Sequence, residues 1–327
     1  MKQQAIDPRH DLVHTPDPGR ERWRESYYFS FYDFRLGLGG YSSIGYRPSK
    51  GYSGSVNLLW GPDRATLVAS ERGSRTAHDD DHEVAGMTYR AHEPFGNWSW
   101  GFAGQLNDGG SAVDCDLEAI KGATESERPS VAVDYDLVFA PDQPLYMYAE
   151  NPEWDGLFDG HLDEVGRVTG SVRIDGETYE IDGRGSKDHS WGVRDWARPK
   201  GWRWIDILFE EGPEVTLWRA TFDGARWLQD GAIYADGAAD PVTSFEEAIG
   251  YASRPPADRP ATWDFSIGSE HHDLRGHAEI LRCVPLRFPI RDAEGNQAIM
   301  WNDRTNFRCE LADGRVGIGS AEFQIRV

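Results

Sequence analysis

The sequence is short of basic side chains, and this shortage narrows the range of partners. Its 327 residues contain 34 lysines and arginines against 55 aspartates and glutamates, so the formal charge is 34 − 55 = −21 with histidine neutral. Such a surplus of negative charge repels phosphate backbones and anionic lipid surfaces. We therefore expect no nucleic-acid partner and no docking on an anionic membrane.

Long apolar runs are also lacking. The sequence has no run of about 18 apolar residues, the length that a membrane-spanning helix needs, so no membrane span is expected. The chain begins Met1-Lys2-Gln3-Gln4 with no apolar stretch behind it, and a secretory signal is therefore not indicated. We expect a cytoplasmic protein.

Cysteine is scarce, and Cys115, Cys283 and Cys309 have no metal-type spacing. Without a signal peptide, reduced thiols are the expected state. His78 and His82 flank three aspartates, but their surroundings are typical of a solvated loop, so we predict no metal site. The absence of a Gly-x-Ser-x-Gly elbow argues against a standard serine hydrolase.

Helical periodicity is scarce, whereas aromatic residues and glycines are abundant. The chain has 13 Trp, 13 Tyr and 14 Phe, together with 36 Gly. Aromatic residues favour strands, and glycine favours tight turns. The glycine-rich Leu36–Gly40 is not followed by a helix, as a dinucleotide-binding fold would require. The composition predicts an all-β protein.

Short alternating runs joined by Asp-Gly pairs predict β-hairpins. The pair Asp175-Gly176 lies between two such runs, and Asp-Gly recurs at residues 223–224 and 313–314. Asp-Gly suits these turns because it tolerates positive φ. Val84–Ala91 is predicted as one strand, and Thr243–Ile249 as either a short helix or another strand. Many short antiparallel strands are typical of barrels or sandwiches.

The length favours two domains. The segment Asn151–Gly156 contains proline and glycine and is the best candidate boundary. We therefore predict an N-terminal β domain of residues 1–155 and a C-terminal β domain of residues 156–327. Each half is long enough to bury its own core.

One segment, Lys187–Trp196, concentrates ionisable groups beside tryptophans. It holds two Asp, one His, one Arg, one Lys and two Trp. In an extended strand, alternate side chains face opposite sides. One side then takes Asp188, Ser190, Gly192, Arg194 and Trp196, and the other takes His189, Trp191, Val193 and Asp195. A turn or bulge at Gly192 would break this alternation.

Two interpretations of this segment remain open. In a partly apolar pocket, a desolvated carboxylic acid holds its proton near neutral pH and can donate it. An adjacent histidine can tune or replace that acid, and tryptophan faces stabilise developing positive charge. Alternatively, the segment forms an internal ion-pair network, in which Arg194 pairs with Asp188 or Asp195 and His189 is hydrogen-bonded in the core.

The segment also carries a resemblance to a known family. The motif is Gly183-x-Gly185-x-x-Asp188-His189-Ser190-Trp191-Gly192-x-Arg194-Asp195-Trp196, with support from Trp202–Asp206, Trp23–Phe29 and Gly317–Phe323. With these residues the sequence resembles the carotenoid 1,2-hydratase (hydroxyneurosporene synthase) and AttH-like family of the calycin group. Tocopherol cyclases and lipocalin-like Diels–Alderases are relatives of that family. The similarity spreads over most of the chain but is strong only around Asp188.

This resemblance implies a fold and a set of site residues. The expected fold is two lipocalin-like antiparallel β-barrel or sandwich domains packed together, with the motif in the C-terminal one. Asp188 and His189 become the candidate acid/base pair, with Asp195 as a third catalytic candidate. The substrate-binding candidates are Trp191, Arg194, Trp196, Trp204, Asp206 and Tyr28.

The expected function is that of an acid/base enzyme without cofactors: a hydratase or dehydratase, an isomerase or a cyclase. Its substrate would be a small hydrophobic molecule, terpenoid-, steroid- or polyene-like, in a tryptophan-lined pocket. The acidic chain has no apolar docking helix, which favours a smaller substrate than a membrane-embedded carotenoid. The alternative is a lipocalin-like carrier that binds a hydrophobic ligand without chemistry. The oligomeric state is not indicated.

Overall fold

The computed structural model describes residues 6–15, 19–74, 76–78, 81–115, 129–254, 257–291 and 297–326. Every regular element of more than four residues in these ranges is a β-strand. The short 3₁₀ turns are η1 (Pro8–Asp11), η2 (Pro48–Lys50) and η4 (Pro152–Trp154). The predicted all-β class is therefore confirmed. Within the described ranges, no helix has the length and apolar character needed to cross a membrane.

The chain forms two compact units, so the expectation of two β domains is confirmed. Unit 1 consists of residues 1–108 and 119–194, and unit 2 of residues 109–118 and 195–327. This division differs from the boundary predicted between residues 155 and 156. The reason is that β11 (Gly160–Ile174) and β12 (Glu177–Val193) pair with strands that precede that boundary, β9 and β1 respectively. The motif up to Arg194 therefore belongs to unit 1, and its last two residues, Asp195 and Trp196, belong to unit 2.

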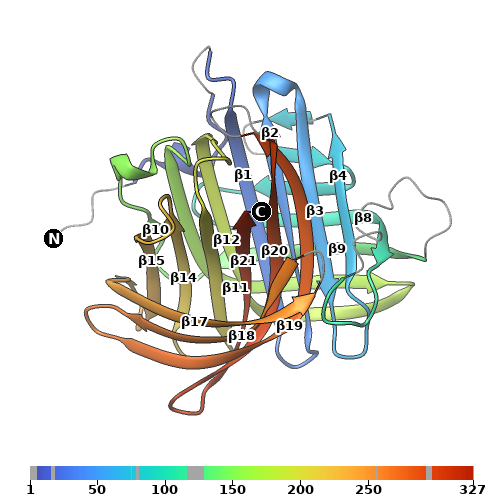
Figure 1. Ribbon diagram of the computed structural model, residues 1–327. Helices are drawn as coiled ribbons and strands as arrows, with labels where there is room; N and C mark the ends of the chain where they lie inside the picture. The colour runs from blue at the N-terminus through green and yellow to red at the C-terminus, as the bar shows by residue number, and fades with distance from the viewer. Residues whose placement is uncertain are drawn as a thin grey trace. The chain divides into compact units, whose positions relative to one another are not determined.

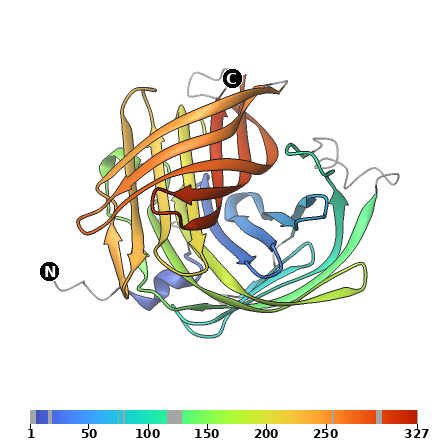
Figure 2. The same ribbon diagram turned by 90° about the horizontal axis from the view of Figure 1, so that it is seen from below.

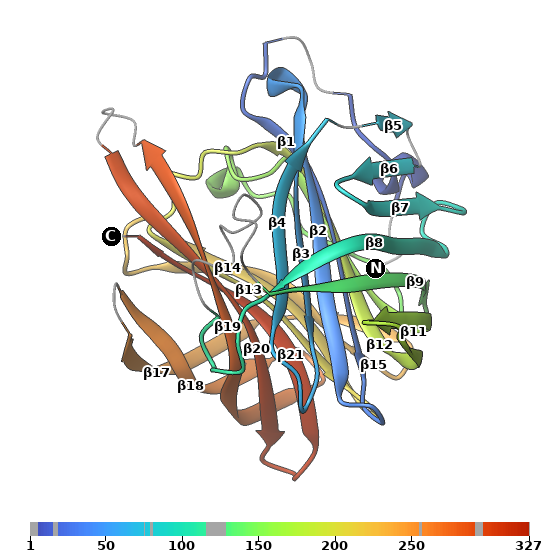
Figure 3. The same ribbon diagram turned by 90° about the vertical axis from the view of Figure 1, so that its right-hand side faces the viewer.

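Unit 1 is one antiparallel sheet whose pairing returns to its starting strand. The order β11-β12-β1-β2-β3-β4-β8 is closed by β9, which bonds to both β8 and β11 (Figures 1 and 3). Closure of this kind is the arrangement of lipocalin-like barrels. The remaining bounds are β1 (Trp23–Asp33), β2 (Leu38–Arg47), β3 (Tyr52–Trp60), β4 (Leu67–Gly73), β5 (Thr76–His78), β6 (Asp81–Val84), β7 (Met87–Ala91), β8 (Trp98–Asp108), β9 (Ser130–Pro141) and β10 (Tyr146–Met147).

The core of unit 1 follows from the alternation of side chains along its strands. Tyr27, Phe29 and Phe31 of β1 point to one side and are buried against the indoles of Trp98 and Trp100. Burial of side chains of this size contributes about 2–3 kcal/mol each. The side of the sheet that these residues line is called the inner face below.

Unit 2 is a nine-stranded antiparallel sheet with a core of its own. Its order is β16-β15-β14-β13-β21-β20-β19-β18-β17, and Figure 2 shows β17–β19 bending strongly. Trp263, Phe307 and Phe323 pack together in its core. The bounds are β13 (Gly201–Phe209), β14 (Glu214–Thr221), β15 (Trp227–Ala235), β16 (Ala238–Pro241), β17 (Ser244–Arg254), β18 (Ala257–Gly268), β19 (Asp273–Arg291), β20 (Gln297–Leu311) and β21 (Val316–Arg326).

The turn predictions were largely confirmed. Asp175 and Gly176 have φ of 50° and 84° between β11 and β12, as predicted for this hairpin, and the other two Asp-Gly pairs lie between paired strands. Of the two alternatives for Thr243–Ile249, the strand is found, because Ser244–Ile249 belong to β17. The single strand predicted at Val84–Ala91 is wrong, because Ala85-Gly86 makes a tight turn between β6 and β7 with φ of 50° and 79°.

Candidate functional site

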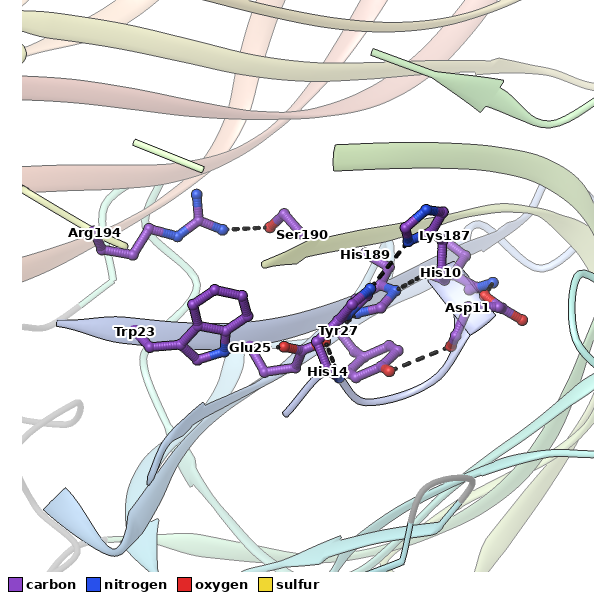
Figure 4. Close-up of polar contacts among 10 residues, drawn as sticks. All are labelled: His10, Asp11, His14, Trp23, Glu25, Tyr27, Lys187, His189, Ser190 and Arg194. Carbon is purple, nitrogen blue, oxygen red and sulfur yellow. Dashed lines mark hydrogen bonds and ion pairs between the residues drawn. The ribbon is translucent and has the colours of Figure 1, made fainter. Parts of the chain in front are cut away.

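The motif forms the end of strand β12, with β1 on one side and β11 on the other. Asp188 lies opposite Tyr28 of β1 and Asp163 of β11, and His189 lies opposite Tyr27 and Leu162. Side chains alternate along β12 as predicted. Figure 4 shows Ser190 and Arg194 on one side of the strand and the contacts of His189 on the other.

Asp188 belongs to a buried cluster on the outer face of this sheet. Its carboxylate contacts Nε2 of His161, and the same nitrogen is 3.4 Å from Oδ1 of Asp163. The Tyr148 hydroxyl donates a 2.6 Å hydrogen bond to Oδ2 of Asp163. Tyr148 also stacks on the His161 ring, at 4.1 Å between ring centroids. The cluster is therefore an imidazole held by two carboxylates and one aromatic ring.

The two ring nitrogens of His161 have different surroundings. Nε2 faces both carboxylates, whereas Nδ1 is buried and has no hydrogen-bond partner among the described residues. Phe158 approaches the ring edge-on at 5.3 Å. Catalytic acids and bases often use an imidazole that is oriented by a carboxylate on one of its nitrogens.

The charges in this cluster favour a protonated imidazole. Burial alone lowers the pKa of His161, but the charges of Asp188 and Asp163 outweigh it and raise the pKa to about 9. Burial also raises the pKa of Asp163, despite the opposing attraction of His161. His161 is therefore an imidazolium at neutral pH, and its Nδ1–H is a proton donor.

Arg194 lies on the same face, at the end of β12. Its Nη2 donates a 2.8 Å hydrogen bond to Oγ of Ser190, and its Nη1 donates to the carbonyl of Leu157. Burial lowers the pKa of Arg194 to about 10, although the negative charge of Asp188 opposes the shift. The guanidinium carries its charge at neutral pH and adds positive potential near Asp188.

His189 belongs to a different cluster, on the inner face (Figure 4). Its Nε2 is 2.7 Å from Oε1 of Glu25, and its Nδ1 is 2.8 Å from the carbonyl oxygen of His10. Oε1 of Glu25 is also 2.9 Å from Nδ1 of His14. Trp191 stacks on the His14 ring at 4.0 Å. These contacts tie the N-terminal segment to β1 and β12.

A buried ion cluster lies beside His189 on the inner face. Nζ of Lys187 contacts the carboxylates of Asp11 and Glu164, and all three side chains are inaccessible to solvent. The two carboxylates raise the pKa of Lys187 although burial opposes them. This cluster matches the ion-pair interpretation of the motif, with Lys187 as its cation in place of Arg194.

The structure does not bring the predicted catalytic residues together. Asp188 and His189 occupy opposite faces of β12, and Trp191 lies with His189. Asp195 opens unit 2, where its carboxylate accepts a hydrogen bond from the backbone N–H of Ala197. Asp188 and His189 therefore do not form the predicted acid/base pair. Asp188 contacts His161, and His189 contacts Glu25.

The predicted substrate-binding residues are also distributed. Tyr28 shares the outer face with Asp188, as Arg194 does. Trp204 and Asp206 share one face of β13, where Oδ1 of Asp206 accepts a 2.6 Å hydrogen bond from the N–H of Ser320. Trp196 contacts Trp202 at 4.7 Å between ring centroids. Both Trp204 and Asp206 are buried.

Sequence reasoning missed His161 and Asp163, as well as Glu25 and His14. A signal was present for the first pair, because His161 and Asp163 are two residues apart in a strand and must share a face. Glu25 lies within the supporting segment Trp23–Phe29, but it was not predicted as a site residue. No pattern distinguished His14, because its position depends on how the N-terminal segment folds back onto β1.

Two sets of side chains are close enough to share a metal ion: His14, Glu25 and His189, and His161, Asp163 and Asp188. In the second set, one nitrogen faces both carboxylates, and a shared proton satisfies that geometry. A separate groove of about 600 Å³ lies on unit 2. Charged side chains such as Asp264, Arg275 and Glu310 line it, so it does not suit a hydrophobic substrate.

The chain was compared with protein families and with curated proteins. The family described as "Domain of unknown function (DUF7064)" matches residues 7–327. No curated protein matches the chain in sequence.

Three solved structures are similar in fold. An AttH candidate from Nitrosomonas europaea is 14% identical with a TM-score of 0.65, over 99% of this chain and 97% of that one. CghA, solved with Sch210972, is 10% identical with a TM-score of 0.56, over 96% and 94%. Kievitone hydratase from Nectria haematococca is 12% identical with a TM-score of 0.56, over 91% and 88%. These similarities confirm the lipocalin-like fold that the motif predicted.

Proposed function

The chain belongs to the DUF7064 family, and we propose that it is an enzyme that transfers protons to and from a small hydrophobic substrate without a cofactor. The observation that carries the proposal is the His161 ring. Its Nε2 is fixed by Asp188 and Asp163, and its Nδ1 is buried without a partner among the described residues. The fold shared with kievitone hydratase supports an enzyme over a structural protein.

In the proposed reaction, His161 is the acid. Its Nδ1 proton is transferred to one carbon of a C=C bond, and the π electrons form the new C–H bond. Water captures the positive charge on the other carbon, and the proton that this water loses returns to Nδ1. The reverse sequence is dehydration, and loss of a different proton to Nδ1 is isomerisation. In cyclisation, a second C=C bond of the substrate captures the cation, and the new cation then loses a proton to Nδ1. Asp188 and Asp163 act through His161 and are positioning residues.

The substrate belongs to the proposal as well. Terpenoid-, steroid- or polyene-like alkenes suit a site whose acid is surrounded by the rings of Tyr148 and Phe158. We assign Tyr28 and Arg194 to substrate binding on this face. Trp196, Trp204 and Asp206 stay predicted binding residues, and they belong to unit 2. The cytoplasmic location is part of the same proposal, and Cys115, Cys283 and Cys309 are all buried.

Solvent isotope incorporation tests the proposal. The full chain is incubated with a panel of terpenoid and steroid alkenes in heavy water, and recovered material is examined by mass spectrometry. We expect deuterium in a C–H position of substrate or product. His161→Gln should slow incorporation about 100-fold, as loss of a general acid does. His277→Gln, an exposed histidine in β19, is the matched control and should leave the rate unchanged.

Two results would contradict this assignment. Equal incorporation by a folded His161→Gln variant would exclude His161 as the acid. Ligand retention without deuterium in any member of the panel would identify a carrier instead, which a closed ring of strands also suits. Circular dichroism of each variant establishes that the fold is intact.

A further inference from the structure

The inner-face cluster around His189 combines three side chains from distant parts of the sequence. His14 comes from the N-terminal segment, Glu25 from β1 and His189 from β12 (Figure 4). One imidazole nitrogen from each histidine and one oxygen of Glu25 all lie within 4.8 Å of one another. Glu25 and His189 are buried, and the His14 side chain is only 18% exposed. Two imidazoles and one carboxylate are a common ligand set for divalent transition metals.

Two hydrogen-bond contacts fix the orientation of His189 in this cluster. The carbonyl oxygen of His10 can only accept a hydrogen bond, so Nδ1 of His189 must carry the hydrogen. In a neutral ring Nε2 is then a lone pair, yet it faces Oε1 of Glu25 at 2.7 Å. Two acceptors at this distance need a proton or a metal ion between them. A proton on either partner satisfies the contact, and so does a metal ion that binds both atoms.

The surroundings of His189 fix the orientation of its ring. The ring is completely buried and stacks on Tyr27 at 4.0 Å between ring centroids. A neutral ring whose Nδ1–H is held by a backbone carbonyl presents its Nε2 lone pair in a fixed direction. That is the usual support of a metal-ligating histidine.

We propose that His14, Glu25 and His189 bind one divalent transition-metal ion of the zinc class. Nδ1 of His14, Oε1 of Glu25 and Nε2 of His189 are the ligand atoms. Three protein ligands leave a coordination position for water. The ion fastens the N-terminal segment to β1 and β12, next to the point where Asp11 of that segment contacts Lys187. This role is independent of the proposed proton transfer on the opposite face of β12.

Metal titration of the full chain tests the site. The protein is stripped with a chelator and titrated with Zn²⁺ alone, with binding followed by calorimetry and by the thermal midpoint of unfolding. We expect one equivalent to bind and the midpoint to rise. Co²⁺ in place of Zn²⁺ should give the visible absorption bands of a nitrogen- and oxygen-ligated site.

Variants of the proposed ligands, and of one histidine outside the cluster, test which side chains bind the ion. His14→Ala removes a partly exposed ligand without opening the core, and it should abolish the single equivalent. His92→Ala is the matched control, because His92 is an exposed histidine of unit 1 whose ring contacts Ser99, and it should retain the equivalent. Glu25→Gln keeps the volume of the carboxylate and should also lose binding.

The outcomes decide the proposal. Absence of stoichiometric Zn²⁺ binding would overturn it, as would equal binding by His14→Ala and the unsubstituted chain. His161→Gln should still bind one equivalent, and loss of binding in this variant would assign the ion to the cluster on the outer face instead. Because proton transfer is measured separately by deuterium incorporation, failure of the metal site leaves the proposed function untouched.

Discussion

The charge of His161 is set by the two carboxylates that contact it. Its pKa is raised from 6.5 to about 9 by Asp188 and Asp163, against the effect of burial. A group whose pKa is higher in the folded state stabilises the fold fully below its unfolded pKa, and this stabilisation is lost as the pH rises through the folded pKa. For His161 the window therefore runs from about pH 6.5 to about pH 9.

A pH series of unfolding free energies tests this charge state. The shift of 9 − 6.5 = 2.5 units corresponds to about 3 kcal/mol. The difference in unfolding free energy between the unsubstituted chain and His161→Gln should therefore shrink by about 3 kcal/mol between pH 6 and pH 10. Denaturant titrations at several pH values measure it. A difference that does not change with pH would show that His161 is neutral in the folded protein.

The sequence identified Asp188 but not the residue on which it acts. Asp188 stood out because it lies among ionisable groups and tryptophans in a contiguous motif. Its partner His161 is 27 residues away, and only the register of β11 against β12 places it opposite Ser190. The same holds for Glu25 and His189, which come from strands that are adjacent in the sheet but far apart in the chain. Pairing between distant strands has no local signature in a sequence.

The backbone conformation of strand β12 requires a glycine at position 192. This residue has φ of 130°, in the region that favours glycine, and a Cβ at its position would lie 2.3 Å from the backbone nitrogen of Asp159. That nitrogen donates a 2.7 Å hydrogen bond to the carbonyl of Trp191. The register with β1 nevertheless continues through Gly192 to Val193, so no turn or bulge at Gly192 interrupts this pairing.

Substitution of Gly192 should therefore be costly. Gly192→Ala combines an unfavourable φ with a backbone clash, and we expect it to lower the free energy of unfolding by about 3 kcal/mol or more. Gly176→Ala is the matched control, because Gly176 also has positive φ but a Cβ there would meet no atom within 4 Å. It should cost only about 1 kcal/mol. Equal losses in thermal or chemical unfolding would rule out the clash with Asp159.

Turn chemistry explains which elements were predictable. Asp175-Gly176 predicts a hairpin because both residues tolerate positive φ, and the structure has that turn. Ala85 adopts φ of 50° with a side chain that rarely does so, and Val84–Ala91 therefore resembled one strand. The neighbouring Gly86 was the available signal. Local sequence thus located hairpins where the residues favour the turn and missed one where the surrounding strands impose it.

In the whole molecule, the sequence has 40 aromatic residues (13 Trp, 13 Tyr and 14 Phe), and some of them build a core in each unit. The sequence predicted two β domains because of its length, but it placed their boundary at the proline and glycine of residues 151–156. In the structure that segment is a connection within unit 1, because β11 and β12 complete the closed ring of strands. Composition therefore indicated how many units to expect, and only long-range pairing showed where each one ends.

Two N-terminal fragments, one ending at residue 155 and one at residue 194, test which of the two boundaries ends the first folding unit. Residues 1–194 contain every strand of the first sheet and should unfold cooperatively with native-like aromatic circular dichroism. Residues 1–155 lack β11 and β12, so β1 and β9 lose partners and Asp11 and Glu25 lose the cations or imidazoles that satisfy them. Uncompensated buried carboxylates cost several kcal/mol each. The shorter fragment should therefore not fold cooperatively, and a stable fold in residues 1–155 would contradict the closed ring as the folding unit.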